Sequence, residues 1–237
     1  MNRLAPIGRL TLGAAISLSL PPYGLWMLAP IGLGLHLRLS QASTKRRQLL
    51  NTFSLWVGYY GVALVWMTDL TVAGWLVAIP VQAVIMSAPM ALVPDSGTGR
   101  SIAFPAALVV AEAIRWVLPF GGVPMSSLAM GPVDSYLVDT VRVSGPLLLI
   151  ASIGVLAIAV EGALSTQIRR VIIALAAVLS IVALAQIAPV GTSNTVIQGS
   201  VVQAGGQLGT RAASSDEAAV FTRHLEAVER HNVETDL

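Results

Sequence analysis

Long apolar stretches separated by short polar segments dominate the first 190 residues. Each has close to the twenty or so apolar residues that a helix needs to cross the hydrocarbon core of a bilayer. Five of them follow the N-terminal region, at residues 49–68, 72–93, 102–119, 143–160 and 171–188. The pattern therefore predicts a bundle of membrane-spanning helices over residues 1–190.

The first apolar stretch, residues 10–37, is interrupted by Pro21 and Pro22 and has basic residues on both sides, among them Arg9 and Arg38. A single span would place these basic residues on opposite sides of the membrane, against the positive-inside rule. A helical hairpin that turns at the two prolines is therefore favoured, with a shallow, partly re-entrant hairpin as the alternative. In arms this short, Arg9 and Arg38 are expected to extend toward the interface. The hairpin raises the total to about seven spans.

The basic residues predict the orientation of these spans. With a cytoplasmic N-terminus, the external loops before residue 190 carry only Arg142. Nine basic residues then lie on the cytoplasmic side: Arg3, Arg9, Arg38, Lys45, Arg46, Arg47, Arg100, Arg169 and Arg170. This bias predicts that the chain after residue 188 lies outside the cytoplasm.

Composition supports a membrane protein, because 55% of the residues are hydrophobic and only 11% are charged. The formal net charge of +2 is too small to indicate a nucleic-acid partner. The chain contains no cysteine, which excludes disulfides, thiolate metal sites and a cysteine nucleophile within these residues. The three histidines, at positions 36, 224 and 231, show no metal-ligand spacing, so we expect no metal site.

The composition changes after residue 190. Residues 194–202, "NTVIQGSVV", are rich in β-branched residues and predict a strand, and residues 204–210 form a glycine-rich loop. Ser214 and Glu217 then match a capping box, followed by an apolar helical face formed by Ala218, Phe221, Leu225 and Val228. One strand and one helix cannot bury enough apolar surface to form a domain. We therefore expect residues 191–237 to be the N-terminal fragment of a second, extracytoplasmic domain.

Glu112 and Arg115 are charged residues within an apolar span, three positions apart and hence on one helix face. As a pair they would neutralise each other, which is a structural role. Alternatively, one of them would bind a lipid head group near the outer surface. The pairing favours the structural role, and we keep both residues as candidate binding residues. A third intramembrane charge, Glu161, is expected at the inner interface.

Four segments resemble the bacterial apolipoprotein N-acyltransferases. "LSLPPYGLWMLAPIGL" at 18–33 is similar to the family's turn between its first two helices, and "FSLWVGYYGVALVWM" at 53–67 to its third span. "EAIRWVLPFGGVPMSSLAMG" at 112–131 resembles the family's Glu-x-x-Arg segment, although Val123 and Met125 stand where aromatic residues are common. "VIQGSVVQ" at 196–203 resembles the strand that opens the family's nitrilase-like domain.

The resemblance implies an α-helical polytopic membrane bundle followed by the first strand and helix of an α/β nitrilase-like domain, in a bacterial plasma membrane. It implies transfer of an acyl chain from a phospholipid to the N-terminal diacylglyceryl-cysteine of lipoproteins, without a cofactor. It also implies a Glu, Lys and Cys triad, whose glutamate is expected after the final "TDL". We therefore expect this chain to be the membrane portion of a longer enzyme and to contain no catalytic residue.

Two other functions remain open at this stage. One is a small transporter, for which Pro80, Pro89 and the intramembrane charges would be relevant. The other is a non-catalytic membrane scaffold for a polyprenol-phosphate glycosyltransferase. The soluble segment after residue 190 argues against the transporter, because it would have no purpose there.

Overall fold

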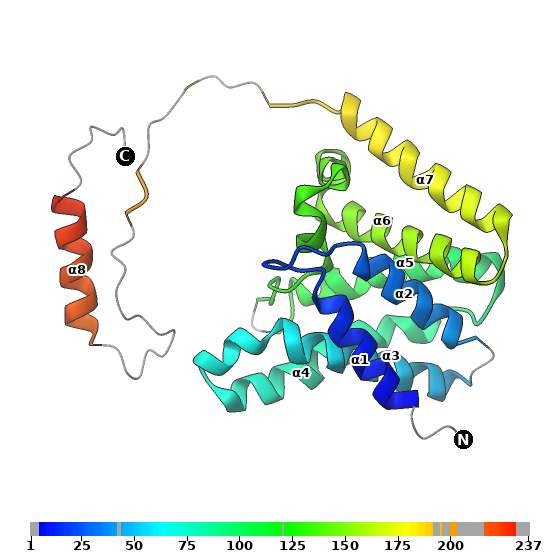
Figure 1. Ribbon diagram of the computed structural model, residues 1–237, viewed down its shortest axis with the longest axis horizontal. Helices are drawn as coiled ribbons and strands as arrows, with labels where there is room; N and C mark the ends of the chain where they lie inside the picture. Colours follow the sequence, from blue (N-terminus) through cyan, green and yellow to red (C-terminus); the bar gives the residue numbers. More distant parts are fainter. Residues whose placement is uncertain are drawn as a thin grey trace.

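The computed structural model describes residues 5–41, 44–119, 121–191, 195, 200–202 and 216–230. Within these residues, seven α-helices with short 3₁₀ helices between them form a bundle, and an eighth α-helix follows (Figure 1). The α-helices are α1 Ala5–Ser17, α2 Leu28–Leu39, α3 Lys45–Ala63, α4 Val72–Ser87, α5 Gly97–Arg115, α6 Val141–Leu164, α7 Ile168–Ile187 and α8 Glu217–Glu229. The 3₁₀ helices are η1 Val65–Asp69, η2 Ala88–Leu92, η3 Leu128–Asp134 and η4 Tyr136–Thr140.

A helix lies in each apolar stretch that the sequence indicated, and the N-terminal stretch contains two, α1 and α2. Pro21 and Pro22 lie in the turn between these two helices, which pack on each other. Whether this hairpin spans the membrane or is partly re-entrant remains a prediction. Among the described residues, three helical segments are long and apolar enough to cross a membrane: Val72–Leu92, Tyr136–Leu164 and Ile168–Ile187. The structure thus shows a helical membrane protein, and the total of about seven crossings remains a prediction.

Glycines let the first three helices approach closely. A Cβ atom at Gly13 of α1 would lie 1.9 Å from the carbonyl oxygen of Leu55, and one at Gly58 of α3 would lie 2.0 Å from that of Leu10. Neither position can accept a side chain unless the backbones separate, so α1 and α3 pack backbone to backbone. Gly34 of α2 also lies close to α6, since a Cβ atom there would lie 2.6 Å from Cβ of Val160. Gly61, the other glycine of α3, has no such contact, because no atom lies within 4 Å of a Cβ placed there.

The chain between α5 and α6 packs against the bundle through η3 and η4. α6 then contains a kink, where Ser144 and Gly145 depart from helical geometry and Gly145 has a φ of 70°. α7 packs on α6 and η4 at the edge of the bundle, and most of its surface is uncovered (Figure 1).

The segment after α7 is described only in part. The predicted strand falls mainly outside the described residues, and residues 200–202, which are described, are not in a strand. The predicted amphipathic helix is present as α8, and Phe221, Leu225 and Val228 on its apolar face are exposed. Its N-cap is Asp216, whose carboxylate accepts from the backbone N–H groups of Ala218 and Ala219. The predicted capping box was therefore wrong in placing the cap at Ser214, because Asp216 lies next to the first helical turn and supplies the same kind of acceptor.

Candidate functional site

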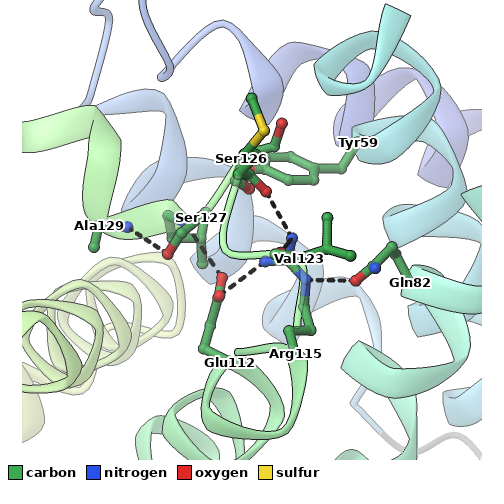
Figure 2. A network of polar contacts seen from close by, with 10 residues as sticks. Tyr59, Gln82, Glu112, Arg115, Val123, Ser126, Ser127 and Ala129 are labelled. Atoms are coloured by element: carbon green, nitrogen blue, oxygen red, sulfur yellow. Dashed lines mark hydrogen bonds and ion pairs between the residues drawn. The ribbon is translucent and has the colours of Figure 1, made fainter. Parts of the chain in front are cut away.

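Glu112 and Arg115 lie in the last turns of α5 with no exposed surface, and they form an ion pair. Arg115 Nη1 donates to Glu112 Oε2 at 2.8 Å, and Arg115 Nε donates to Gln82 Oε1 of α4 at 2.6 Å (Figure 2). The other carboxylate oxygen, Glu112 Oε1, accepts from the backbone N–H of Leu128 at 3.3 Å. Both charges are therefore compensated inside the protein, as burial requires.

Arg115 also holds the loop that follows α5. Its Nη2 donates to the carbonyl oxygens of Val123 at 3.1 Å and of Met125 at 2.8 Å. The backbone N–H of Val123 donates in return to the carbonyl oxygen of Arg115 at 2.8 Å. These contacts involve only the backbone of Val123 and Met125, so they do not depend on the side chains present there. We call Glu112, Arg115, Gln82 and the bound carbonyl groups of this loop the Arg115 cluster.

Two tyrosines of α3 complete the surroundings of the cluster. The ring of Tyr60 lies 4.9 Å from the guanidinium carbon of Arg115, a cation–π distance. The hydroxyl of Tyr59 donates to the carbonyl oxygen of Ser126 at 3.0 Å (Figure 2). Ser126 in turn donates from its hydroxyl to the carbonyl oxygen of Ala63 at 2.9 Å. α3, α4 and α5 thus hold one loop together.

The loop has a conformation that needs this support. Ser126 has a φ of 60°, in the left-handed region that non-glycine residues rarely adopt. Gly122 has a φ of 103°, and a Cβ there would lie 2.0 Å from the carbonyl oxygen of Trp116. Such backbone persists only where surrounding contacts fix it, and it is common at functional sites. The cluster can therefore position a loop, and it contains no cysteine for covalent chemistry.

A second buried polar group lies among α1, α2 and α3. Arg9 Nη1 donates to Nδ1 and to the carbonyl oxygen of His36, both at 3.1 Å. Thr52 donates its hydroxyl proton to the carbonyl oxygen of Gln48 at 2.9 Å, so its oxygen must accept from His36 Nε2 at 3.2 Å. An arginine can only donate, so His36 is the neutral tautomer with its proton on Nε2. Arg9 is 5% exposed. The C-terminal turn of α2 binds its side chain, and its expected position toward the membrane interface remains a prediction.

Charged residues of α5, α6 and α7 also lie near the C-terminal end of α2, at one end of the bundle. Arg100 of α5 donates to the carbonyl oxygen of Leu37 in α2 at 2.8 Å. Glu161 of α6 pairs with Arg170 of α7 and accepts from Gln41, which follows α2. Glu161 is only 1% exposed, because Arg170 and Gln41 cover it, and its expected position at the inner interface remains a prediction. Arg9, Arg100 and Arg170 were all predicted to be cytoplasmic, and the structure places them at the same end of the bundle.

The structure leaves untested whether Glu112 and Arg115 bind a lipid head group, which remains a prediction. Sequence reasoning did not find Gln82 or Thr52. A signal existed for Gln82, the single amide or charged side chain in the apolar stretch 72–93. No signal existed for Thr52, because threonine is common in helices where it bonds only to its own backbone.

Comparison with known families gives a match over much of the chain. The family described as the apolipoprotein N-acyltransferase N-terminal domain matches residues 12–160, more than half of the 237 residues. The matched region begins in α1, ends in α6 and includes the whole Arg115 cluster. Comparison with curated proteins gives no match.

Proposed function

Because the chain belongs to the apolipoprotein N-acyltransferase family, we propose that it forms the membrane platform on which an acyl chain passes from a phospholipid to a lipoprotein. The acceptor in this proposal is the α-amino group of the diacylglyceryl-cysteine at the lipoprotein's N-terminus. The observation that carries the proposal is the family match over residues 12–160, which includes the buried ion pair and the loop that it holds.

The role of these residues in the reaction is positioning. The family resemblance implies a cysteine thiolate that takes the acyl chain as a thioester before the amino group receives it. The chain has no cysteine, so the nucleophile comes from outside these 237 residues. The bundle would hold lipid and catalytic groups at one membrane surface, where orientation lowers the barrier of a reaction between two bound substrates.

The loop on the Arg115 cluster is the part of the bundle that we assign to this surface. In the topology predicted from the basic residues, the helices cross about seven times and the loop after α5 is external. Arg9, Arg100 and Arg170 gather at one end of the bundle, which supports a common side for the basic residues. We place that end in the cytoplasm and the loop at the outer leaflet.

Residues 191–237 would then be external and belong to a nitrilase-like domain. α8 supports this assignment, because Phe221, Leu225 and Val228 are exposed on one helix face. A helix with one exposed apolar face packs against another element, such as the sheet of an α/β domain.

A membrane assay tests the proposal. Membranes from the cells in which the protein occurs naturally, which also supply the cysteine nucleophile of this proposal, receive a phospholipid with an isotope-labelled acyl chain and a synthetic diacylglyceryl-cysteine peptide with a free amino group. Mass spectrometry then measures the labelled amide product. We expect the product to form in these membranes and to be lost when the protein carries Arg115→Met, while Arg142→Met keeps it. Equal product in membranes lacking the protein would contradict the proposal.

A further inference from the structure

A groove with a volume of about 910 Å³ is lined by residues of α5, α6 and α7 and of the turn between α6 and α7. Its volume is within the range of sites that enclose small organic ligands. Ile102 of α5 and Ile173 of α7 line it and are 69% and 58% exposed, so the groove is open to the surroundings of the bundle. It lies toward the N-terminal end of α5, whereas the Arg115 cluster lies at the C-terminal end.

The lining of the groove changes from apolar to polar along α7. Ile173, Ala174 and Ala177 line it within the helix, together with Val155 and Ile158 of α6. At the other end, polar groups come from the start of α5, from the α6–α7 turn and from the start of α7: Thr98, Ser101, Thr166, Gln167, Arg169 and Arg170. A site with this lining fits a ligand with a long apolar part and a polar head.

The polar end of the groove has positive charge. Arg170 is paired with Glu161, which is buried behind it. Arg169 is exposed, and within the described part of the chain it makes no ion pair. No acidic residue is among the described residues that line the groove. A phosphate group at this end would therefore meet an arginine whose charge no carboxylate compensates.

We propose that this groove binds an anionic phospholipid, with the lipid phosphate at Arg169 and one acyl chain along α7 as far as Ala177. Ala177 follows Arg169 by eight positions, which is roughly 12 Å of helix at 1.5 Å per residue, enough for much of an acyl chain. Hydroxyl and amide groups of Ser101 and Gln167 are available to the head group. The proposal does not depend on acyl transfer, because the groove and the Arg115 cluster share no residue.

Native mass spectrometry of the purified chain in detergent tests the head group. Phosphatidylglycerol and phosphatidylcholine with the same acyl chains are titrated separately, and the affinity for the first bound lipid is measured. We expect phosphatidylglycerol to bind more tightly, and Arg169→Gln to weaken its binding roughly fivefold, the effect of one arginine near an anionic lipid. Arg46→Gln, which removes an exposed arginine at the start of α3 outside the groove, should leave the affinity unchanged.

A pair of variants on α7 tests the position of the acyl chain. Ala176 and Ala177 are adjacent and exposed, but only Ala177 lines the groove. We expect Ala177→Trp to fill the groove and weaken phosphatidylglycerol binding, and Ala176→Trp to have no effect. Equal binding of the two lipids, or equal effects of Arg169→Gln and Arg46→Gln, would overturn the assignment of the head group. Equal effects of the two tryptophan variants would overturn the groove as the site.

Discussion

Arg115 at the end of α5 donates from Nη2 to the carbonyl oxygen of Met125, ten residues further along the chain, at 2.8 Å. Glu112 compensates the charge of the same guanidinium group, which also donates a hydrogen bond to Gln82. A planar group with five fixed donors can make all these contacts at once, whereas an ammonium group cannot. One buried side chain thus joins α4, α5 and the loop that we assign to the reaction surface.

The first prediction concerns this side chain. Arg115→Met leaves Glu112 as a buried charge without a partner, which should lower the free energy of unfolding by about 3 kcal/mol or more. Denaturant unfolding of the purified protein in detergent measures the change. Arg142→Met is the matched control, because Arg142 pairs with Asp139 at 2.9 Å but is 40% exposed. An exposed pair contributes at most about 1 kcal/mol.

A double variant tests how much of the lost stability is due to the unpaired charge of Glu112. Glu112→Gln added to Arg115→Met removes the unpaired charge, so it should recover part of the lost stability. If Arg115→Met is no more destabilising than Arg142→Met, the cluster does not hold the loop as described.

The second prediction compares two glycines of α3. Gly58→Ala places a methyl group against the carbonyl oxygen of Leu10 and should destabilise the contact between α1 and α3. Gly61→Ala meets no atom within 4 Å and should be neutral or stabilising by up to about 1 kcal/mol, because alanine is the better helix former. Thermal unfolding of both variants measures the difference. Equal effects would show that α1 and α3 do not approach as closely as the structure has them.

The third prediction concerns His36. The hydrogen bonds of Arg9 and Thr52 require the tautomer with the proton on Nε2, which ¹⁵N NMR of the imidazole ring detects directly. Thr52→Val removes the acceptor of this proton and should cost about 1–3 kcal/mol of stability. Ser54→Ala is the control, because Ser54 also donates to a carbonyl oxygen one turn earlier, at 2.9 Å, and has no hydrogen bond to a histidine. A signal from a protonated Nδ1 would contradict the assigned network.

The helices could be predicted from the sequence because long apolar stretches and the charges between them are local features. The pairing of Glu112 with Arg115 could be predicted for the same reason, since three positions along a helix place both on one face. The hydrogen bond between Arg9 and His36 could not be predicted, because the two residues lie 27 positions apart in the sequence. The loop contacts with Val123 and Met125 could not be predicted either, since Arg115 binds their carbonyl oxygens, which every residue has.

The position of the N-cap shows a different limit. Ser214, Asp216 and Glu217 all lie near the start of α8, and both Ser214 and Asp216 carry side chains that cap helices. Sequence spacing favoured Ser214, while the structure uses Asp216, so the existence of the helix could be predicted better than its first residue.

The central claim, a role in lipoprotein N-acylation, is tested most directly in the cell that produces the protein. The protein is depleted, and mass spectrometry of mature lipoproteins measures the fraction of N-terminal diacylglyceryl-cysteines that carry an amide-linked acyl chain. We predict that this fraction falls on depletion and recovers when the wild-type protein is restored. An unchanged fraction after complete depletion would contradict the claim.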